Sequence, residues 1–273
     1  RFCFKRIDLC SFLLDMMTPV VKFKEVTLEV EGRRYLDQVT CAFQLGETVV
    51  IGGAPGCGKS FFPRLLLGLP GLQESDRLRL WGDVQVEGTS IFSMSREALL
   101  RLRKQMGMVM AGGGLIDNMD IERNVSLPLA YHGGDGGGND IKSRCSEVLD
   151  AVGIPHTRRK GIRPVTLNSE ERIRVGIGRA VVTAPRILLV DDALVGLDQR
   201  ASDQVVELIC GSQTRDAALR LITASRLAPF MWKADRFLLL DECKLIDLGA
   251  SSEVLEHAHP WVMKDREGVD FSP

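Results

Sequence analysis

The sequence has no long apolar run, although 45% of its 273 residues are hydrophobic. A membrane-spanning helix needs about 20 consecutive apolar residues. The longest apolar runs, such as Ile187 to Val190 and Phe237 to Leu240, have only the length of a strand. With 26% charged residues the composition is typical of a globular protein. The length suits one large α/β domain, or such a domain with an inserted lobe.

The chain also lacks an excess of either charge, because 35 Lys and Arg residues face 36 Asp and Glu residues, a net charge of −1. A protein that binds nucleic acid through its phosphates usually carries a basic field. The Arg-rich stretches Arg96 to Lys104 and Arg158 to Lys160 are better interpreted as solvated helix faces. We therefore expect no nucleic-acid partner.

Paired cysteines are missing as well. The seven cysteines are odd in number and widely spaced, and no C-x-x-C pair occurs. This spacing favours reduced thiols over disulfides or a zinc site. The cysteines are Cys3, Cys10, Cys41, Cys57, Cys145, Cys210 and Cys243.

What is present is an alternation of strand and helix patterns. Residues 21–45 read as short alternating strands with a turn at Glu31-Gly32, and Val49 to Ile51 read as a buried strand. Further strands are expected at Ile187 to Val190 and later in the chain, with helical patterns between them. Strands that alternate with helices predict a largely parallel, doubly wound sheet. The remaining expected strands are Leu219 to Thr223, Phe237 to Leu240 and Lys244 to Leu248.

The middle third differs in pattern. Arg96 to Gln105 is predicted to be helical, and apolar residues from Ile141 to Val152 fall on one helix face. Between them Tyr131 to Asp140 is glycine-rich and is expected to be a flexible connection. This stretch predicts a helical lobe inserted between two halves of a sheet domain.

A glycine-rich stretch, Gly53-Ala54-Pro55-Gly56-Cys57-Gly58-Lys59-Ser60, fits the pattern G-x-x-x-x-G-K-[ST] completely. Its glycines let backbone N–H groups turn inward around phosphates. Lys59 would reach the β- and γ-phosphates, and Ser60 would hold Mg²⁺. A buried strand before the stretch and a helix after it supply the context that this P-loop motif requires. The motif predicts a nucleoside triphosphate site.

Cys57 within this loop has two interpretations. Its place at a helix N-terminus could lower its pKa and make it a redox switch. Alternatively, it fills a permissive position in the loop.

A second acidic position, Asp191, follows the apolar run Ile187 to Val190. An Asp at the end of a buried strand can orient Mg²⁺ through water in a P-loop protein. The alternative role is a strand-end cap. Together with the P-loop, the position favours a metal site formed by Ser60 and Asp191.

With these features, residues 20 to 260 resemble the ATP-binding subunit of an ABC transporter. Val190 to Asp198 looks like the Walker B motif and D-loop of that family. The resemblance implies ATP as ligand, bound with Mg²⁺. It also implies an α/β P-loop NTPase (RecA-like) fold with a mostly parallel sheet, an antiparallel β subdomain and an inserted α-helical subdomain. The ATP-binding residues it implies are Gly53, Gly56, Cys57, Gly58, Lys59, Ser60 and Phe61.

On this resemblance we divide the chain into an ATP-binding core and three other segments. The core comprises residues 21–94 and 166–256, and the helical subdomain comprises 95–165. An N-terminal extension at 1–20 and a C-terminal tail at 257–273 complete the division.

A narrower likeness is to the Mla/Mkl type, the ATPase of bacterial phospholipid transport. Gly114 to Met119 and Asn124 to Leu129 are similar to two of its motifs, and His259 to Pro273 is similar in style to its C-terminal extension. This likeness implies a lipid cargo.

Several family positions carry another residue. The Q-loop glutamine is Ala111, and the switch histidine is Ala224, which can neither hold a phosphate nor pass a proton. The position of the adenine-stacking aromatic is Val30, so base stacking is expected to be weak. The catalytic glutamate is Asp192, which keeps the carboxylate but is one methylene shorter. A shift of about 1 Å can slow a reaction ~100-fold.

The signature motif, usually LSGGQ, reads Leu167-Asn168-Ser169-Glu170-Glu171. Asn168 and Glu171 have capping-box spacing at the start of a predicted helix. Glu170 and Glu171 would repel a phosphate and neutralise the positive end of that helix. In the resembling family this helix end covers the γ-phosphate bound by the partner chain, so both halves of the shared site are altered here.

The resemblance implies an ATP-binding subunit at the cytoplasmic face of the inner (cell) membrane, bound peripherally to membrane permease subunits. A second nucleotide-binding subunit, identical or different, would join through the D-loop around Asp198. Hydrolysis through Asp192 is expected to be slow or lost. The alternatives are a non-hydrolysing, nucleotide-gated structural or regulatory subunit, and an ABC-like protein with no membrane partner.

Overall fold

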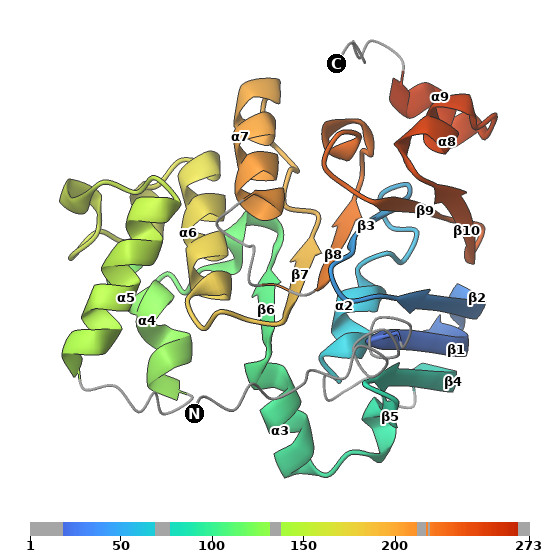
Figure 1. Ribbon diagram of the computed structural model, residues 1–273, viewed down its shortest axis with the longest axis horizontal. Coiled ribbons are helices and arrows are strands. Elements are labelled where there is room, and N and C mark those ends of the chain that lie inside the picture. The colour runs from blue at the N-terminus through green and yellow to red at the C-terminus, as the bar shows by residue number, and fades with distance from the viewer. Residues whose placement is uncertain (1–18, 69–76, 132–137, 212–216, 218, 267–273) are drawn as a thin grey trace, which may run out of the picture.

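The computed structural model describes residues 19–68, 77–131, 138–211, 217 and 219–266. Two sheets and a group of helices form the fold (Figure 1). In the described part of the chain, no helix is both long and apolar enough to cross a bilayer. The predicted N-terminal extension at 1–20 lies almost wholly outside the described residues, as does the glycine-rich segment 132–137.

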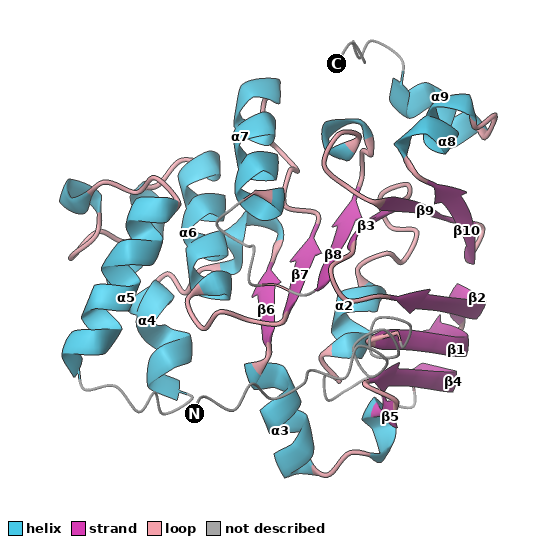
Figure 2. Ribbon diagram, viewed as in Figure 1, coloured by secondary structure: helices cyan, strands magenta, loops and turns pink. Residues whose placement is uncertain are grey.

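The larger sheet has six strands in the order β10-β9-β3-β8-β7-β6. All neighbouring pairs are parallel except β10 with β9. The carboxyl ends of β6, β7 and β8 therefore point to one edge of the sheet (Figure 2). This confirms the predicted fold class and the parallel sheet. The strands are β3 (Thr48–Gly52), β6 (Met106–Val109), β7 (Ile187–Asp191), β8 (Leu219–Ala224), β9 (Arg236–Asp241) and β10 (Lys244–Gly249).

The smaller sheet is antiparallel, with the order β2-β1-β4-β5. Residues 21–30 form one strand rather than two, because the bulge at Glu25, with φ 48°, lets the chain continue in the same strand. Gly82 in β4 lies under this bulge, where an added Cβ would meet the Glu25 carbonyl oxygen at 2.4 Å. The strands are β1 (Val21–Val30), β2 (Arg33–Phe43), β4 (Leu78–Val86) and β5 (Thr89–Ser90).

A group of helices lies together to one side of the six-stranded sheet (Figure 1). In it α6 (Ser169–Val181) packs against β6, and α4 (Ile121–Tyr131), α5 (Gly138–Ala151) and α7 (Gln199–Cys210) pack on α6. Helix α2 (Phe61–Leu66) packs between the two sheets, and α3 (Arg96–Lys104) lies beside β5 and β6. Helices α8 (Ser251–Glu256) and α9 (Pro260–Arg266) follow β10.

The core is divided into two clusters by the larger sheet. In β3, Val50 belongs to the cluster under α4 to α7, whereas Val49 and Ile51 belong to the cluster shared with α2 and the antiparallel sheet. This alternation is the period of two that a strand buried on both faces must have. The last residues of the parallel strands are thereby fixed at the edge where the candidate site lies.

The structure differs from two expectations drawn from the sequence pattern of the middle third. The segment 95–165 contains β6, which pairs with β7 in the main sheet. The segment from Tyr131 to Asp140 is helical at both described ends, since α4 runs through Tyr131 and α5 begins at Gly138. Within the predicted C-terminal tail the structure describes α9. The strand β6 lies in the main sheet because it pairs with β7, a contact that local composition does not reveal.

Candidate functional site

The P-loop connects β3 to α2, as the motif predicts. Gly56 and Gly58 have φ values of 77° and 112°, which glycine adopts without a Cβ clash. At Gly53 an added Cβ would lie 2.7 Å from the Leu240 carbonyl oxygen, so the loop starts in close contact with the end of β9. The loop closes on the helix through a hydrogen bond from the Phe61 N–H to the Gly58 carbonyl, at 2.9 Å.

Lys59 is buried at the centre of this loop, with 3% of its surface exposed. Its Nζ lies 3.2 Å from Asp192 Oδ2 and donates to the Ala54 carbonyl at 3.4 Å. A buried ammonium needs a counter-charge, and Asp192 supplies it. The structure thus joins the two most important predicted residues, Lys59 and Asp192, in one ion pair.

Asp192 is held by a residue that sequence reasoning missed, Ser225. The Ser225 N–H donates to Asp192 Oδ1 at 2.9 Å, and its hydroxyl donates to Oδ2 at 2.6 Å. Asp192 itself has φ 48°, a left-handed conformation that Asp tolerates. Both carboxylate oxygens therefore have partners, and the group is fixed toward Lys59. No local pattern in the sequence marks Ser225, because its role depends on β8 lying beside β7 in the sheet.

Asp191, the last residue of β7, accepts a hydrogen bond from Thr223 Oγ1 at 2.7 Å. Its second oxygen and the Ser60 hydroxyl, which makes no capping bond to α2, are hard oxygen donors of the kind Mg²⁺ prefers. Among the described residues no group of three or more His, Cys, Asp or Glu could hold a metal ion. The donor set fits an ion that takes most of its ligands from phosphates and water.

Burial raises the pKa of the Cys57 thiol above its ordinary value, and the nearby amides and Lys59 only partly offset this. A raised pKa keeps the sulfur protonated and poorly nucleophilic. The redox-switch interpretation is therefore disfavoured, and Cys57 packs as an apolar group. It is one of five free cysteines in the described part of the chain, with Cys41, Cys145, Cys210 and Cys243.

An aromatic pair that the sequence reasoning missed lies against the P-loop. The rings of Tyr35 and Phe61 are 5.0 Å apart, and Tyr35 lies so near the loop that an added Cβ on Gly58 would be 3.1 Å from its Cβ. The Arg33 guanidinium sits over the Tyr35 ring at 5.0 Å. Val30, by contrast, is an aliphatic residue at the end of the β1–β2 hairpin. Tyr35 is one of only two tyrosines in the chain, which is the signal that could have found it.

A cavity of about 330 Å³ opens beside Asp192. Pro55 of the P-loop, the segment from Asp192 to Leu197, and Thr223 to Arg226 contribute to its lining. Ala224, which is 4% exposed, is also in that lining. The cavity thus lies where the predicted catalytic and switch positions meet.

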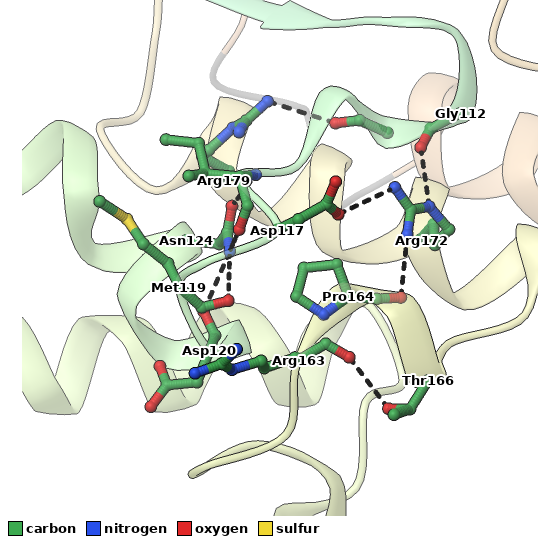
Figure 3. A network of polar contacts seen from close by, with 12 residues as sticks. Gly112, Asp117, Met119, Asp120, Asn124, Arg163, Pro164, Thr166, Arg172 and Arg179 are labelled. Carbon is green, nitrogen blue, oxygen red and sulfur yellow. Dashed lines mark hydrogen bonds and ion pairs between the residues drawn. The ribbon is translucent and has the colours of Figure 1, made fainter.

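The loop at the Q-loop position, Ala111–Gly114, is tied to α6 (Figure 3). Arg172 donates to the Pro164 carbonyl at 2.9 Å and contacts Asp117 at 3.6 Å, and Arg179 donates to the Gly113 carbonyl at 3.2 Å. Burial lowers the pKa of Arg179. The exposed Ala111 methyl takes no part in this network, so the loop is held by its backbone.

The N-terminus of α6 carries the capping box that the sequence predicts. Asn168 Oδ1 accepts from the Glu171 N–H at 2.8 Å, and Glu171 Oε2 accepts from the Asn168 N–H at 3.0 Å. Glu170 pairs with Arg174 at 2.6 Å, and Glu171 lies 3.3 Å from Arg158. The two carboxylates are therefore balanced by cations of the same chain, while the helix-end amides are partly occupied.

Asp198, expected in a dimer contact, caps α7 in this structure, because its Oδ1 accepts from the Ala201 N–H at 2.8 Å. This local role does not oppose a second role at an interface. It does mean that a substitution at Asp198 would weaken α7 in addition to any effect on assembly.

Comparison with known proteins identifies the family. Residues 36–195, more than half of the chain, match the family model described as ABC transporter. The methionine import ATP-binding protein MetN of Caulobacter vibrioides is 30% identical over 241 residues, which cover 87% of this chain and 69% of MetN. MetN of Carboxydothermus hydrogenoformans is 28% identical, with 92% of this chain and 71% of the relative covered.

Solved structures show the same fold at lower identity. The ATP-binding cassette MJ0796, in a dimeric post-hydrolysis state bound to ADP and Pi, has a TM-score of 0.71 and 23% identity and covers 82% of this chain and 96% of its own. The cbiO1 structure from Clostridium perfringens, part of the ABC transporter complex cbiONQ, has a TM-score of 0.72 and 21% identity, with 91% and 94% covered. These structures show the fold, and the family model together with the MetN relatives shows that the chain belongs to the ABC transporter family, as one of its ATP-binding subunits.

Proposed function

We propose that this chain binds Mg-ATP at Gly53 to Ser60 and couples that binding to a membrane permease. The observation that carries the proposal is the buried Lys59 ammonium inside an intact glycine loop. Its counter-ion, Asp192, is held only 3.2 Å away and is partly exposed, so a phosphate can replace it as the partner of Lys59. A phosphate offers more acceptor oxygens and more charge than one carboxylate.

The nucleobase would rest on Tyr35 and Phe61. A base stacked on an aromatic ring contributes about 1–3 kcal/mol in single-stranded nucleic-acid complexes. The Arg33 guanidinium above Tyr35 adds a second planar surface. This pair compensates for the aliphatic Val30, and it offers a face that accepts any base, so we propose affinity without strict selection of adenine.

Mg²⁺ would be bound by the Ser60 hydroxyl and oriented by Asp191, whose hydrogen bond from Thr223 fixes the carboxylate plane. Bound there, the ion neutralises phosphate charge and polarises the phosphoryl oxygens. The chain's own contribution is to hold these two oxygen donors at the carboxyl edge of the sheet.

Hydrolysis is proposed to be slow or lost. The Asp192 carboxylate is oriented by two hydrogen bonds from Ser225 and by Lys59, and it is one methylene shorter than glutamate, so it reaches less far toward an attacking water. Ala224 offers no proton carrier. The start of α6, with Glu170 and Glu171, would be a poor site for the γ-phosphate of a partner chain.

Membrane permease subunits and a second nucleotide-binding subunit are the proposed partners, at the cytoplasmic face of the membrane. The dimeric state of the cassette MJ0796 supports the second of these. For the cargo, the relatives are named for methionine import, and they do not support the phospholipid assignment that the Mla/Mkl likeness implied. Methionine is thus the better-supported cargo.

Steady-state phosphate release tests this proposal. The wild-type chain, alone and with its permease, is expected to turn over well below about 1 per second, the lower end for enzymes. Asp192→Glu combined with Ala224→His is expected to raise the rate about 10-fold, because the pair restores a longer carboxylate and a proton carrier beside the cavity, and a general acid–base group contributes at least that much.

The matched control is Asp203→Glu, which lengthens an exposed carboxylate on α7 away from the site. Wild-type release of several phosphates per second that disappears in Asp192→Ala would contradict slow hydrolysis. Saturable ATP binding with no release under any condition would favour the nucleotide-gated structural subunit.

A further inference from the structure

The C-terminal helix α9 packs at the edge of the sheet that carries the P-loop. Figure 1 shows it at the end of the chain, beyond β9 and β10. Val262 is buried, and His259 Nε2 lies 3.3 Å from Asp241 Oδ2 at the end of β9. The helix has only seven residues, too few to be stable alone, so these contacts determine its position.

Trp261 is the apolar anchor of this helix. An added Cβ on Gly52, the last residue of β3, would meet the Trp261 ring at 3.0 Å and Leu227 Cδ2 at 2.8 Å. The indole and the Leu227 side chain therefore lie directly against the end of β3, where the P-loop begins. Leu227 is 1% exposed and belongs to the same core cluster against which Trp261 packs.

Asp265 makes the polar contact. Its Oδ2 accepts from the Leu227 N–H at 2.7 Å and from the Ala228 N–H at 3.0 Å, and its side chain is 8% exposed. Arg226 approaches its other oxygen at 3.9 Å. A carboxylate that accepts two backbone bonds while nearly buried is a strong, directional contact. It fixes the start of the turn Ala228–Phe230.

These contacts connect α9 to the P-loop lysine through one short segment. Ser225 lies two residues before Leu227, and Ser225 provides both hydrogen bonds that direct Asp192. Asp192 in turn pairs with Lys59. The position of the loop 225–228 therefore determines the strength of the Asp192–Lys59 ion pair. A phosphate must break this pair in order to bind Lys59.

We propose that α9 is an internal clamp on the loop 225–228, with Asp265 as its positioning residue, and that the clamp stabilises the Lys59–Asp192 pair against nucleotide. This inference rests on the proposed function, since it presumes that ATP competes with Asp192 for Lys59. A contact that stabilises only the nucleotide-free arrangement lowers nucleotide affinity by linkage. No residue of α9 needs to touch the nucleotide.

The test compares the Mg-ATP dissociation constant of Asp265→Ala with that of the wild-type chain. Loss of the clamp is expected to tighten binding about five-fold, within the usual range of coupling between sites. In an Asp192→Asn background the same substitution is expected to change nothing, because the pair through which the clamp acts has been removed. Hydrogen exchange of the nucleotide-free protein should show faster exchange at the Leu227 and Ala228 amides.

Asp265→Asn keeps one acceptor oxygen, so its Mg-ATP dissociation constant is expected to lie between those of the wild type and Asp265→Ala. It replaces Asp265→Ala in the test if that variant does not fold. Glu256→Ala, which removes an exposed carboxylate from the neighbouring helix α8, is the charge-matched control and should behave as wild type. Equal shifts in both backgrounds, weaker binding, or unchanged exchange at the two amides would overturn the clamp. Failure of the wild-type chain to bind ATP would instead refute the proposed function.

Discussion

Replacing Lys59 with alanine is expected to lower the affinity for Mg-ATP at least ~100-fold. The change removes charge-assisted hydrogen bonds to phosphate, each worth about 1.5–3 kcal/mol, and about 2.7 kcal/mol corresponds to that factor. Displacement of a fluorescent ATP analogue measures it. Lys59 is the one cationic residue from Gly53 to Ser60, so no other residue of the loop can take its place.

Lys59→Ala also leaves Asp192 without its cation, so stability must be separated from affinity. The pair Lys59→Met with Asp192→Asn removes both charges and is expected to keep near wild-type stability, because neither partner is left as an unpaired charge. It should still fail to bind ATP. The control Lys24→Ala removes an exposed cation from β1 and should change neither quantity. An unchanged affinity of Lys59→Ala for ATP would contradict the proposal that the P-loop binds the nucleotide.

Gly113→Ala is expected to reduce the free energy of unfolding by about 3 kcal/mol or more, through backbone strain and a forced shift of α6. An added Cβ would lie 2.2 Å from the Arg172 carbonyl oxygen, at a residue with φ 82°. Arg179 donates to the carbonyl of the same residue, so a shift would also break that bond. Urea denaturation measures the change.

The adjacent Gly112 supplies the matched control. It has φ 65°, and an added Cβ meets nothing within 4 Å. Gly112→Ala should therefore reduce the free energy of unfolding by only about 1 kcal/mol, because alanine is strained in the left-handed conformation. Equal losses for the two variants would show that the contact between this loop and α6 does not matter for stability.

Features that depend on residues close together in the sequence could be predicted. The P-loop, its strand and its helix were located by a motif that fixes the backbone around phosphates. The capping box of Asn168 and Glu171 was also confirmed, since it needs only a separation of three residues. The parallel sheet followed from the alternation of strands and helices.

Features set by distant contacts could not be predicted. The strand β6 has only four residues, and it lies in the sheet because β7 pairs with it. Helix α9 is short, and its position is determined by Trp261 and Asp265 against the loop after β8. The role of Ser225 depends on the pairing of β7 with β8. These two strands are far apart in the sequence but adjacent in the sheet. Local propensity carries no information about such contacts.

Asp192 shows how a site can be located from sequence while its role is not. The family resemblance predicted Asp192 at the position of the catalytic glutamate, and the structure places its Oδ2 3.2 Å from Lys59 Nζ. The hydrogen bonds from Ser225 could not be foreseen, and they turn the group toward the lysine. A predicted catalytic residue is thus proposed to act mainly as the counter-ion that ATP displaces.

The most direct test of the account is to identify the nucleotide that the chain retains. The purified wild-type protein is incubated with Mg²⁺ and γ-labelled ATP, separated from free nucleotide before the slow hydrolysis expected above could complete one turnover, and denatured. The account predicts that about one nucleotide per chain is recovered, and that it is intact ATP. Recovery of ADP with free phosphate, or of no nucleotide at all, would contradict it.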